Sequence, residues 1–201
     1  MARDQEPVIG REGSLPKGVA RRLEILDRAI EVFRQRGADG TSLRRIAEAI
    51  GVSHAALLHY FDSREQLLVA VYAHAETQRA AAEGPTTHSG IDGMIAAAMA
   101  NVDVPGLVQL YTTLVAASLE IRSEVGKEFF SERFERIRTR LTAELKAEQD
   151  AGTVRDDVPA EHLAALIIAA SDGLQIQWLL EPSVGLEAPL RSLATMLEPR
   201  R

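Results

Sequence analysis

Cysteine is absent from this chain of 201 residues, which excludes disulfide bonds and thiolate metal sites. No uninterrupted apolar run reaches the roughly 18 residues of a membrane span, and the first residues lack the apolar region of a signal peptide. The most apolar segment, 163–180, is interrupted by serine, aspartate and glutamine, and we interpret it as a buried helix. We therefore expect a cytoplasmic protein with no membrane partner.

Recognisable catalytic patterns are also lacking. The sequence contains no glycine-rich phosphate loop, no nucleophile paired with a base and no pair of carboxylates placed for acid–base work. Its five histidines do not group at metal-ligand spacing. We predict that the chain is not an enzyme and that it holds no metal and no cofactor. A small helical enzyme remains an alternative, without a catalytic constellation to support it.

The two parts of the chain differ in charge. Residues 1–64 carry 11 Lys/Arg and 9 Asp/Glu, a net charge of +2, whereas residues 65–201 carry 12 and 20, a net charge of −8. Together they give the −6 of the whole chain. A mildly basic N-terminal module on an acidic body suits a protein that binds nucleic acid with one part and is regulated through the other.

Apolar residues recur at helical spacing along most of the chain, and no segment has the pattern of a strand. Helices are predicted near residues 21–36, 42–50, 53–60, 63–79, 91–101, 105–121, 124–150, 159–181 and 187–198. The fold class is therefore all-α, with about nine helices. We expect a disordered N-terminal arm at 1–17, a three-helix domain at 18–66 and a larger helical domain at 67–201, because residues 1–17 show mixed charge, glycine and proline without periodicity.

Residues 40–66 predict two short helices that cross at a tight turn. Ala47 provides a small side chain where two helix backbones approach, and Gly51 provides a residue that accepts a positive φ in the turn. Ser53 can cap the second helix, and Leu57 can pin it onto the first. This is the layout of a helix-turn-helix, whose second helix enters the DNA major groove.

Small and polar side chains occupy the free face of that second helix. Ser53, His54, Ala55 and His59 can reach base edges or phosphates, with two arginines of the preceding helix beside them. Arg64 begins the next helix, where the helix dipole disfavours a cation unless an external phosphate faces it. The alternative is a plain helical hairpin with solvated arginines.

These residues resemble the DNA-binding domain of the TetR (tetracycline repressor) family. The matching segments are TSLRRIA at 41–47, GVS at 51–53, LLHYF at 57–61 and SREQLL at 63–68, and DGL at 172–174 also fits the family pattern. The resemblance implies a homodimeric, ligand-responsive transcriptional repressor that binds a palindromic operator in double-stranded DNA. A constitutive DNA-binding protein without an effector remains an alternative.

Carried over by position, the resemblance assigns DNA contacts to eleven residues. They are Thr41, Ser42, Arg44, Arg45, Ser53, His54, Ala55, Ala56, His59, Tyr60 and Arg64. Leu58 departs from the family, because tyrosine is common there and contacts DNA through its hydroxyl group. Tyr60 or His59 would have to compensate for that loss. Arg64 replaces the usual lysine and keeps the charge.

The helix predicted at 159–181 is apolar nearly all round, which indicates burial on every side. With the helix at 187–198 it can build a symmetric four-helix interface between two copies of the chain. The residues expected in this dimer interface are Leu163, Leu166, Ile167, Ala170, Gly173, Leu174, Leu190, Leu193 and Leu197. Burial within one chain is the alternative.

A pocket for an unknown small-molecule effector is expected between the helices of the larger domain, as the resemblance implies. Its expected lining is Tyr72, Leu107, Tyr111, Leu114, Ser118, Phe130, Phe134, Asp172, Gln175 and Trp178. Asp172 could contact a cationic or hydroxylated ligand, or make a structural hydrogen bond to a neighbouring helix. The alternative for the aromatic residues is that they form ordinary core.

Overall fold

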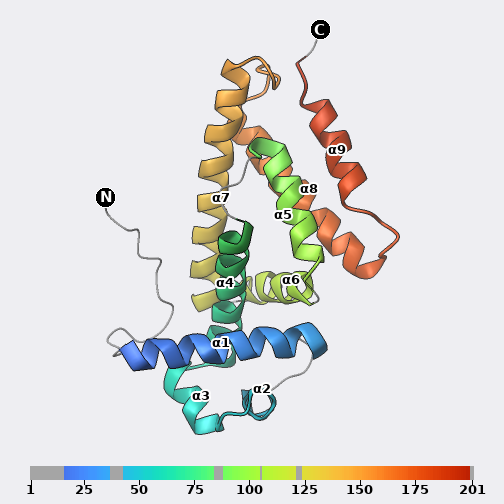
Figure 1. The fold of residues 1–201 in the computed structure, drawn as a ribbon. Coiled ribbons are helices and arrows are strands. Elements are labelled where there is room, and N and C mark those ends of the chain that lie inside the picture. The colour runs from blue at the N-terminus through green and yellow to red at the C-terminus, as the bar shows by residue number, and fades with distance from the viewer. Residues whose placement is uncertain (1–15, 37–42, 84–87, 105, 121–123, 200–201) are drawn as a thin grey trace.

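The computed structural model describes residues 16–36, 43–83, 88–104, 106–120 and 124–199 of the chain. Every regular element among these residues is an α-helix, which confirms the all-α prediction with about nine helices (Figure 1). The helices are α1 (Pro16–Arg36), α2 (Leu43–Ile50), α3 (His54–Tyr60), α4 (Arg64–Glu83), α5 (Gly90–Val102), α6 (Leu107–Ser118), α7 (Glu124–Asp150), α8 (Ala160–Leu180) and α9 (Glu187–Met196). The predicted bounds lie within three residues of these, except that α1 begins at residue 16 rather than 21 and α4 ends at residue 83 rather than 79.

The first three helices form a small unit at one end of the molecule. Figure 1 shows α1 lying across the lower end of α4, with α2 and α3 beneath it. Their facing surfaces bury Ile25, Ile46, Leu57 and Phe61 almost completely. We call the described residues up to 66 the head, and the described residues from 67 onward the body.

The predicted domain limits can be placed on these helices. Pro16 and Lys17 belong to the first turn of α1 rather than to the predicted arm, whose residues 1–15 lie outside the described part of the chain. The limit predicted between residues 66 and 67 falls within α4 and stays a prediction. One buried apolar cluster crosses it, from Ile25 in α1 through Leu67 in α4 to Tyr111 in α6.

The body consists of the rest of α4 together with α5–α9. Its second apolar cluster fills the space between α5, α7, α8 and α9, with Leu141, Leu145, Ile167 and Leu190 fully buried. Figure 1 shows α7 running along most of the body and α6 crossing near the head. α4 belongs to both regions, because its start is in the head and its later turns pack on α6 and α7.

By length and composition, α8 is long and apolar enough to cross a bilayer. The helices α5 and α6 pass the same test only if they are counted together as one span with a bend of 105°. The core helix of a folded domain passes the same test. In this structure α8 packs along α7 and buries Leu163 and Ile167 against it and its other neighbours. We therefore interpret α8 as a core helix, as its interrupted apolar sequence indicates.

Candidate nucleic-acid interface and buried polar cluster

The turn between α2 and α3 has the geometry that its central glycine predicts. Gly51 takes a φ of +71°, in the left-handed region that glycine enters without steric cost. The Val52 amide donates to the Ala47 carbonyl at 2.9 Å, and the Gly51 amide donates to the Glu48 carbonyl at 3.3 Å. These two bonds form a Schellman motif, which ends α2 at a fixed point and sets the direction of α3.

Serine side chains cap the two helices that follow the turn. Ser53 Oγ accepts a hydrogen bond from the Ala56 amide at 3.0 Å, which confirms the predicted cap of α3. Ser63 Oγ accepts from the Gln66 amide at 3.0 Å, as a capping box requires. The return bond departs from that of a capping box, because Gln66 Oε1 accepts from the Asp62 amide at 2.6 Å rather than from the Ser63 amide. Both ends of the α3–α4 connection are thus held locally.

The outer face of α3 presents four exposed side chains. His54, Ala55, Leu58 and His59 lie on one side of the helix, as positions three and four apart must. Leu57 points the opposite way and is fully buried in the head. Burial of Leu57 therefore fixes which face of α3 is free to meet another molecule.

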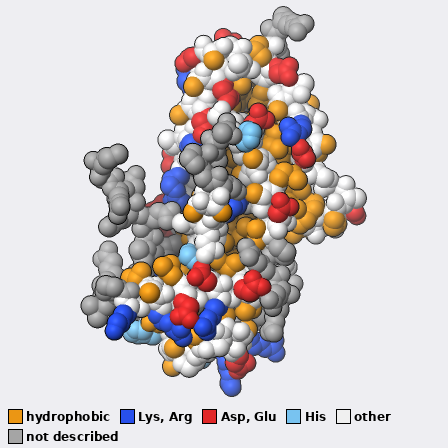
Figure 2. Space-filling view, in the orientation of Figure 1, with side chains coloured by type: hydrophobic (Ala, Val, Ile, Leu, Met, Phe, Trp, Pro, Cys, Tyr) orange, Lys and Arg blue, Asp and Glu red, His pale blue; other side chains and the backbone are white. Residues whose placement is uncertain are grey.

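Cationic and aromatic side chains flank this face. Arg44 is 80% exposed and pairs with Glu48 one turn along α2, and Arg45 is exposed beside it. Tyr60 and Arg64 are half-buried at the α3–α4 connection. Figure 2 shows Lys and Arg side chains gathered at the head end of the molecule, with acidic side chains among them. The predicted DNA contacts Thr41 and Ser42 lie outside the described residues.

A second polar site lies inside the body, where α4, α6, α7 and α8 meet. Arg133 of α7 donates to Glu76 of α4 through Nε at 3.0 Å and through Nη2 at 2.7 Å, both to Oε1. The Arg133 side chain is only 11% exposed, and that of Glu76 is 23% exposed. The guanidinium carbon lies 5.0 Å from the ring centre of Tyr111 and 5.6 Å from that of Tyr72. Its distance to the ring centre of Phe134 is 6.0 Å, so Arg133 combines a charge-assisted pair with three cation–π contacts.

Two tyrosine hydroxyl groups extend this cluster. Tyr72 donates to Glu76 at 3.0 Å, and Tyr111 donates to Oδ2 of Asp172 in α8 at 3.0 Å. Burial raises the pKa of the Asp172 carboxyl, although the Tyr111 hydrogen bond and Arg133 oppose the rise. Burial also raises the pKa of both tyrosines, so each hydroxyl keeps its proton and acts as a donor. We call Tyr72, Glu76, Tyr111, Arg133 and Asp172 the polar cluster.

Sequence reasoning included Tyr72, Tyr111 and Asp172 in this region but missed Glu76 and Arg133. The two missed residues are 57 positions apart, and each looks like an ordinary surface charge in isolation. One signal was available for Arg133, since it shares a helix side with Phe130 and Ile137, where an apolar residue is expected. A charge on an apolar stripe indicates a buried partner.

The predicted pocket residues separate into two groups in the structure. Tyr72, Tyr111 and Phe130 contact one another, with ring centres 5.4–6.0 Å apart, in the same buried cluster as Leu107 and Leu114. A second group faces the other apolar cluster, where Trp178 packs and where Gln175 bonds to Ser171 and Asn101. Ser118 donates to the Val115 carbonyl within α6, and Phe134 borders both clusters.

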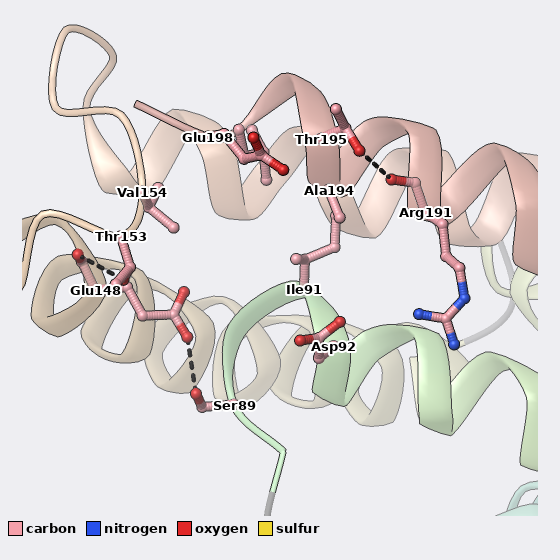
Figure 3. A pocket seen from close by; sticks show the side chains of 11 residues that line it. Ser89, Ile91, Asp92, Glu148, Thr153, Val154, Arg191, Ala194, Thr195 and Glu198 are labelled. Carbon is pink, nitrogen blue, oxygen red and sulfur yellow. Dashed lines mark hydrogen bonds between the residues drawn. The ribbon is translucent and has the colours of Figure 1, made fainter. Parts of the chain in front are cut away.

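Two cavities described in the structure lie away from these residues. One of about 420 Å³ opens between the start of α5, the end of α7 and α9, and Figure 3 shows Ser89 and Glu148 hydrogen-bonded at its edge. Another of about 340 Å³ lies on the surface of α8 and α9. None of the ten predicted pocket residues lines either cavity. Five of the predicted pocket residues, Tyr72, Leu107, Tyr111, Leu114 and Phe130, pack together in one buried apolar cluster.

Four of the predicted interface residues are buried within the subunit. Leu163, Ile167, Leu190 and Leu197 are at most 5% exposed and pack in its own core. Their place in an interface between two copies stays a prediction. Because α8 is apolar nearly all round, its sequence did not show which stripe faces outward.

The outer stripe of α8 and α9 exposes four apolar side chains, of which only Leu166 was among the predicted interface residues. Leu166 is 59% exposed, Ile176 45%, Leu180 81% and Met196 66%. The remaining predicted residues, Ala170, Gly173, Leu174 and Leu193, line the surface cavity beside them. We call this stripe the outer face of α8 and α9.

Contacts along α4 connect the head to the body. Glu65, in the first turn of α4, accepts a hydrogen bond from the Gly126 amide at the start of α7 at 3.0 Å. His74, halfway along α4, lies 2.7 Å from Asp27 of α1. With the Glu76 pair described above, α4 is tied to α1 and twice to α7. A shift of α4 relative to α7 would therefore move the head.

Comparisons with known proteins agree with this arrangement. The family model of the bacterial regulatory proteins of the tetR family matches residues 25–71, and that of the C-terminal region of BetI-type transcriptional repressors matches residues 109–198. The HTH-type transcriptional repressor Rv1474c of Mycobacterium tuberculosis is 30% identical over 77% of this chain and 80% of its own length.

Solved structures share the fold. A TetR-family regulator from Rhodococcus sp. superposes with a TM-score of 0.71 at 20% identity, over 89% of this chain and 98% of its own. A transcriptional regulator from Saccharomonospora viridis, solved in complex with choline, gives a TM-score of 0.66 at 20% identity, over 89% and 95%. The head, the body and the sequence matches lead to one conclusion: the chain belongs to the tetR family of DNA-binding transcriptional regulators, which are not enzymes.

Proposed function

We propose that this regulator is a homodimeric repressor that binds a palindromic operator through α3 and is released from it by a small-molecule effector. The observation that carries the proposal is the exposed face of α3, formed by His54, Ala55, Leu58 and His59 on a helix whose start is capped and whose other side is buried. A rigid helix with a free face of small and polar groups suits the major groove. The repressor named among its relatives supports the same role.

Dimerisation supplies the second half of the operator contact. Two recognition helices must lie about 34–36 Å apart to enter successive major grooves of one DNA face, and a two-fold dimer provides that spacing. The outer face of α8 and α9 is the surface proposed for this contact, because it exposes Leu166, Ile176, Leu180 and Met196. An apolar stripe of this kind is typical of an interface between two copies of a chain.

The effector is proposed to act at the polar cluster. This cluster joins α8, which bears the proposed dimer face, to α4, which enters the head. A ligand that competes for Arg133 or Asp172 would loosen or redirect α4 and so change the distance between the two heads. The choline complex of a structural neighbour is one instance in this fold of a small molecule bound to such a regulator.

One alternative is a constitutive DNA-binding regulator with no effector, because five of the predicted pocket residues pack together in one buried cluster. Screening small molecules distinguishes the effector-released repressor from the constitutive regulator. An effector must both shift the melting temperature of the protein and release it from bound DNA. A protein that stays on its DNA with every ligand tested would be assigned to the constitutive class.

DNA binding itself is tested with a duplex that the full-length protein selects from a randomised pool. Fluorescence anisotropy should show tight, salt-dependent binding to the selected duplex and weak binding to a scrambled one. Arg64→Ala should weaken binding to both duplexes and reduce the salt slope by about one phosphate contact. His54→Ala should instead change which duplex is preferred. Equal affinity of the wild-type protein for both duplexes would overturn the proposal.

The dimer is tested by sedimentation of Leu166→Glu, which places a charge on the outer face of α8 and α9. Burying an unpaired carboxylate is strongly unfavourable, so the variant should sediment as a monomer and lose its operator affinity. Leu119→Glu is the matched control, because Leu119 is 82% exposed at the end of α6. A wild-type protein that is monomeric at working concentration would contradict this part of the proposal.

A further inference from the structure

Leu58 is an exposed leucine near the centre of the outer face of α3. Its side chain is 40% exposed, whereas Leu57 beside it is fully buried. Helical spacing sets Leu58 one turn after His54 and Ala55, with His59 at the edge of the same face. A single exposed leucine is ordinary on a protein surface. Leu58 differs because it occupies the surface that is proposed to enter the groove.

Leucine has no hydrogen-bonding group, which limits what it can contact in the major groove. It cannot bond to phosphate oxygens or to the donor and acceptor groups of base edges. The base edges offer one apolar group there, the C5-methyl group of thymine. Ala55, exposed three positions before Leu58, leaves space and adds a second apolar surface on the same side of the helix.

We propose that Leu58, with Ala55 beside it, recognises a thymine in each operator half-site through the C5-methyl group of that base. This inference rests on the proposed function, in that α3 must enter the major groove. It makes Leu58 a specificity-determining residue, which discriminates thymine from cytosine by apolar contact. A purely structural role for Leu58 would create no dependence on a methyl group of the DNA.

The experiment replaces the thymines of the selected duplex one at a time by deoxyuridine, which differs only in lacking the methyl group. Wild-type protein should lose about fourfold in affinity at the contacted position, the value expected for one buried methyl group. Leu58→Ala should bind the original duplex more weakly and should show no further loss with deoxyuridine at that position. Alanine is a good helix former, so this exposed substitution should leave the head folded.

Leu23→Ala is the matched control, because Leu23 of α1 is 41% exposed in the same head but lies outside α3. It should keep the wild-type response to every deoxyuridine. Binding of Leu58→Ala to scrambled DNA should equal that of the wild type, since phosphate contacts are intact.

Two results would overturn the inference alone. One is specific binding by the wild type that no deoxyuridine changes, and the other is a Leu58→Ala protein as sensitive to each deoxyuridine as the wild type. Equal wild-type affinity for selected and scrambled duplexes would overturn the proposed function and this inference together.

Discussion

The head and the body are built by interactions of different range. In the head, the bonds that shape the free face join residues three to five positions apart, such as Ser53 to Ala56 and Ala47 to Val52. In the body, the bonds of the polar cluster join Glu76 to Arg133 and Tyr111 to Asp172, which are 57 and 61 positions apart. The head is therefore specified by short motifs, whereas the polar cluster exists only when four helices are packed.

This difference suits the two tasks proposed for the molecule. A face that reads DNA must keep its shape, and local caps and the buried Leu57 hold α3 in place. A site that responds to a ligand must have two arrangements of similar free energy. The buried charge pair between α4 and α7 is the candidate for such a site under the proposed function, because burial opposes the attraction of the charges.

Breaking the buried pair should have the largest effect on stability. Arg133→Met leaves Glu76 partly buried without its cation, and such single deletions cost about 3–5 kcal/mol. Urea denaturation of the full-length protein measures the loss. A loss below about 1 kcal/mol would mean that water replaces the arginine and that the pair does not hold α4 to α7.

Two further variants test whether the loss of stability comes from burial of the unpaired charge. Arg138→Met removes an exposed pair with Glu135 on the same helix and should cost less than about 1 kcal/mol. Combining Arg133→Met with Glu76→Leu removes both buried charges and should recover much of the lost stability. If the double variant is no more stable than Arg133→Met, the cost comes from packing of the arginine chain rather than from an unpaired charge.

The same contrast explains how much could be predicted from the sequence. The positive φ of Gly51 and the cap by Ser53 follow from local chemistry, and the structure confirms both. Most helix bounds follow as well, although α1 begins five residues before its predicted start at residue 21. The outward stripe of α8 does not follow, because Leu163 and Leu166 are the same residue type on a helix that is apolar all round. Their environments depend on where α7 and α9 pack, which a local pattern does not contain.

Gly51 in the head and Gly152 in the body occupy equivalent turns, so the same substitution can be compared in the two regions. Each has a φ of +71° and closes a Schellman motif, Gly51 after α2 and Gly152 after α7. Alanine at either position should cost about 1–2 kcal/mol, the strain of a left-handed residue with a Cβ atom. Both losses are measured by urea denaturation.

DNA binding should separate these two glycine variants. Gly51→Ala changes the direction in which α3 leaves the turn, so it should also reduce the preference for the selected duplex. Gly152→Ala should keep that preference, since its turn lies at the far end of the body (Figure 1). If both variants lose the same preference for the selected duplex, the reduced stability of the protein alone weakens DNA binding.

The smallest effect is expected for Asp172→Asn, because asparagine still accepts the Tyr111 hydrogen bond and only the charge is removed. Burial raises the pKa of Asp172 above the ordinary 3.8, so the folded state binds this proton more tightly than the unfolded state does. The cost in stability therefore grows as the pH rises above 3.8 and is complete once the pH exceeds the folded pKa. The variant should be more stable than the wild type at neutral pH.

Urea denaturation at decreasing pH should show that this advantage of Asp172→Asn disappears as the pH falls toward 3.8. An advantage that is independent of pH would assign the effect to packing, and lower stability at neutral pH would show that attraction to Arg133 outweighs burial.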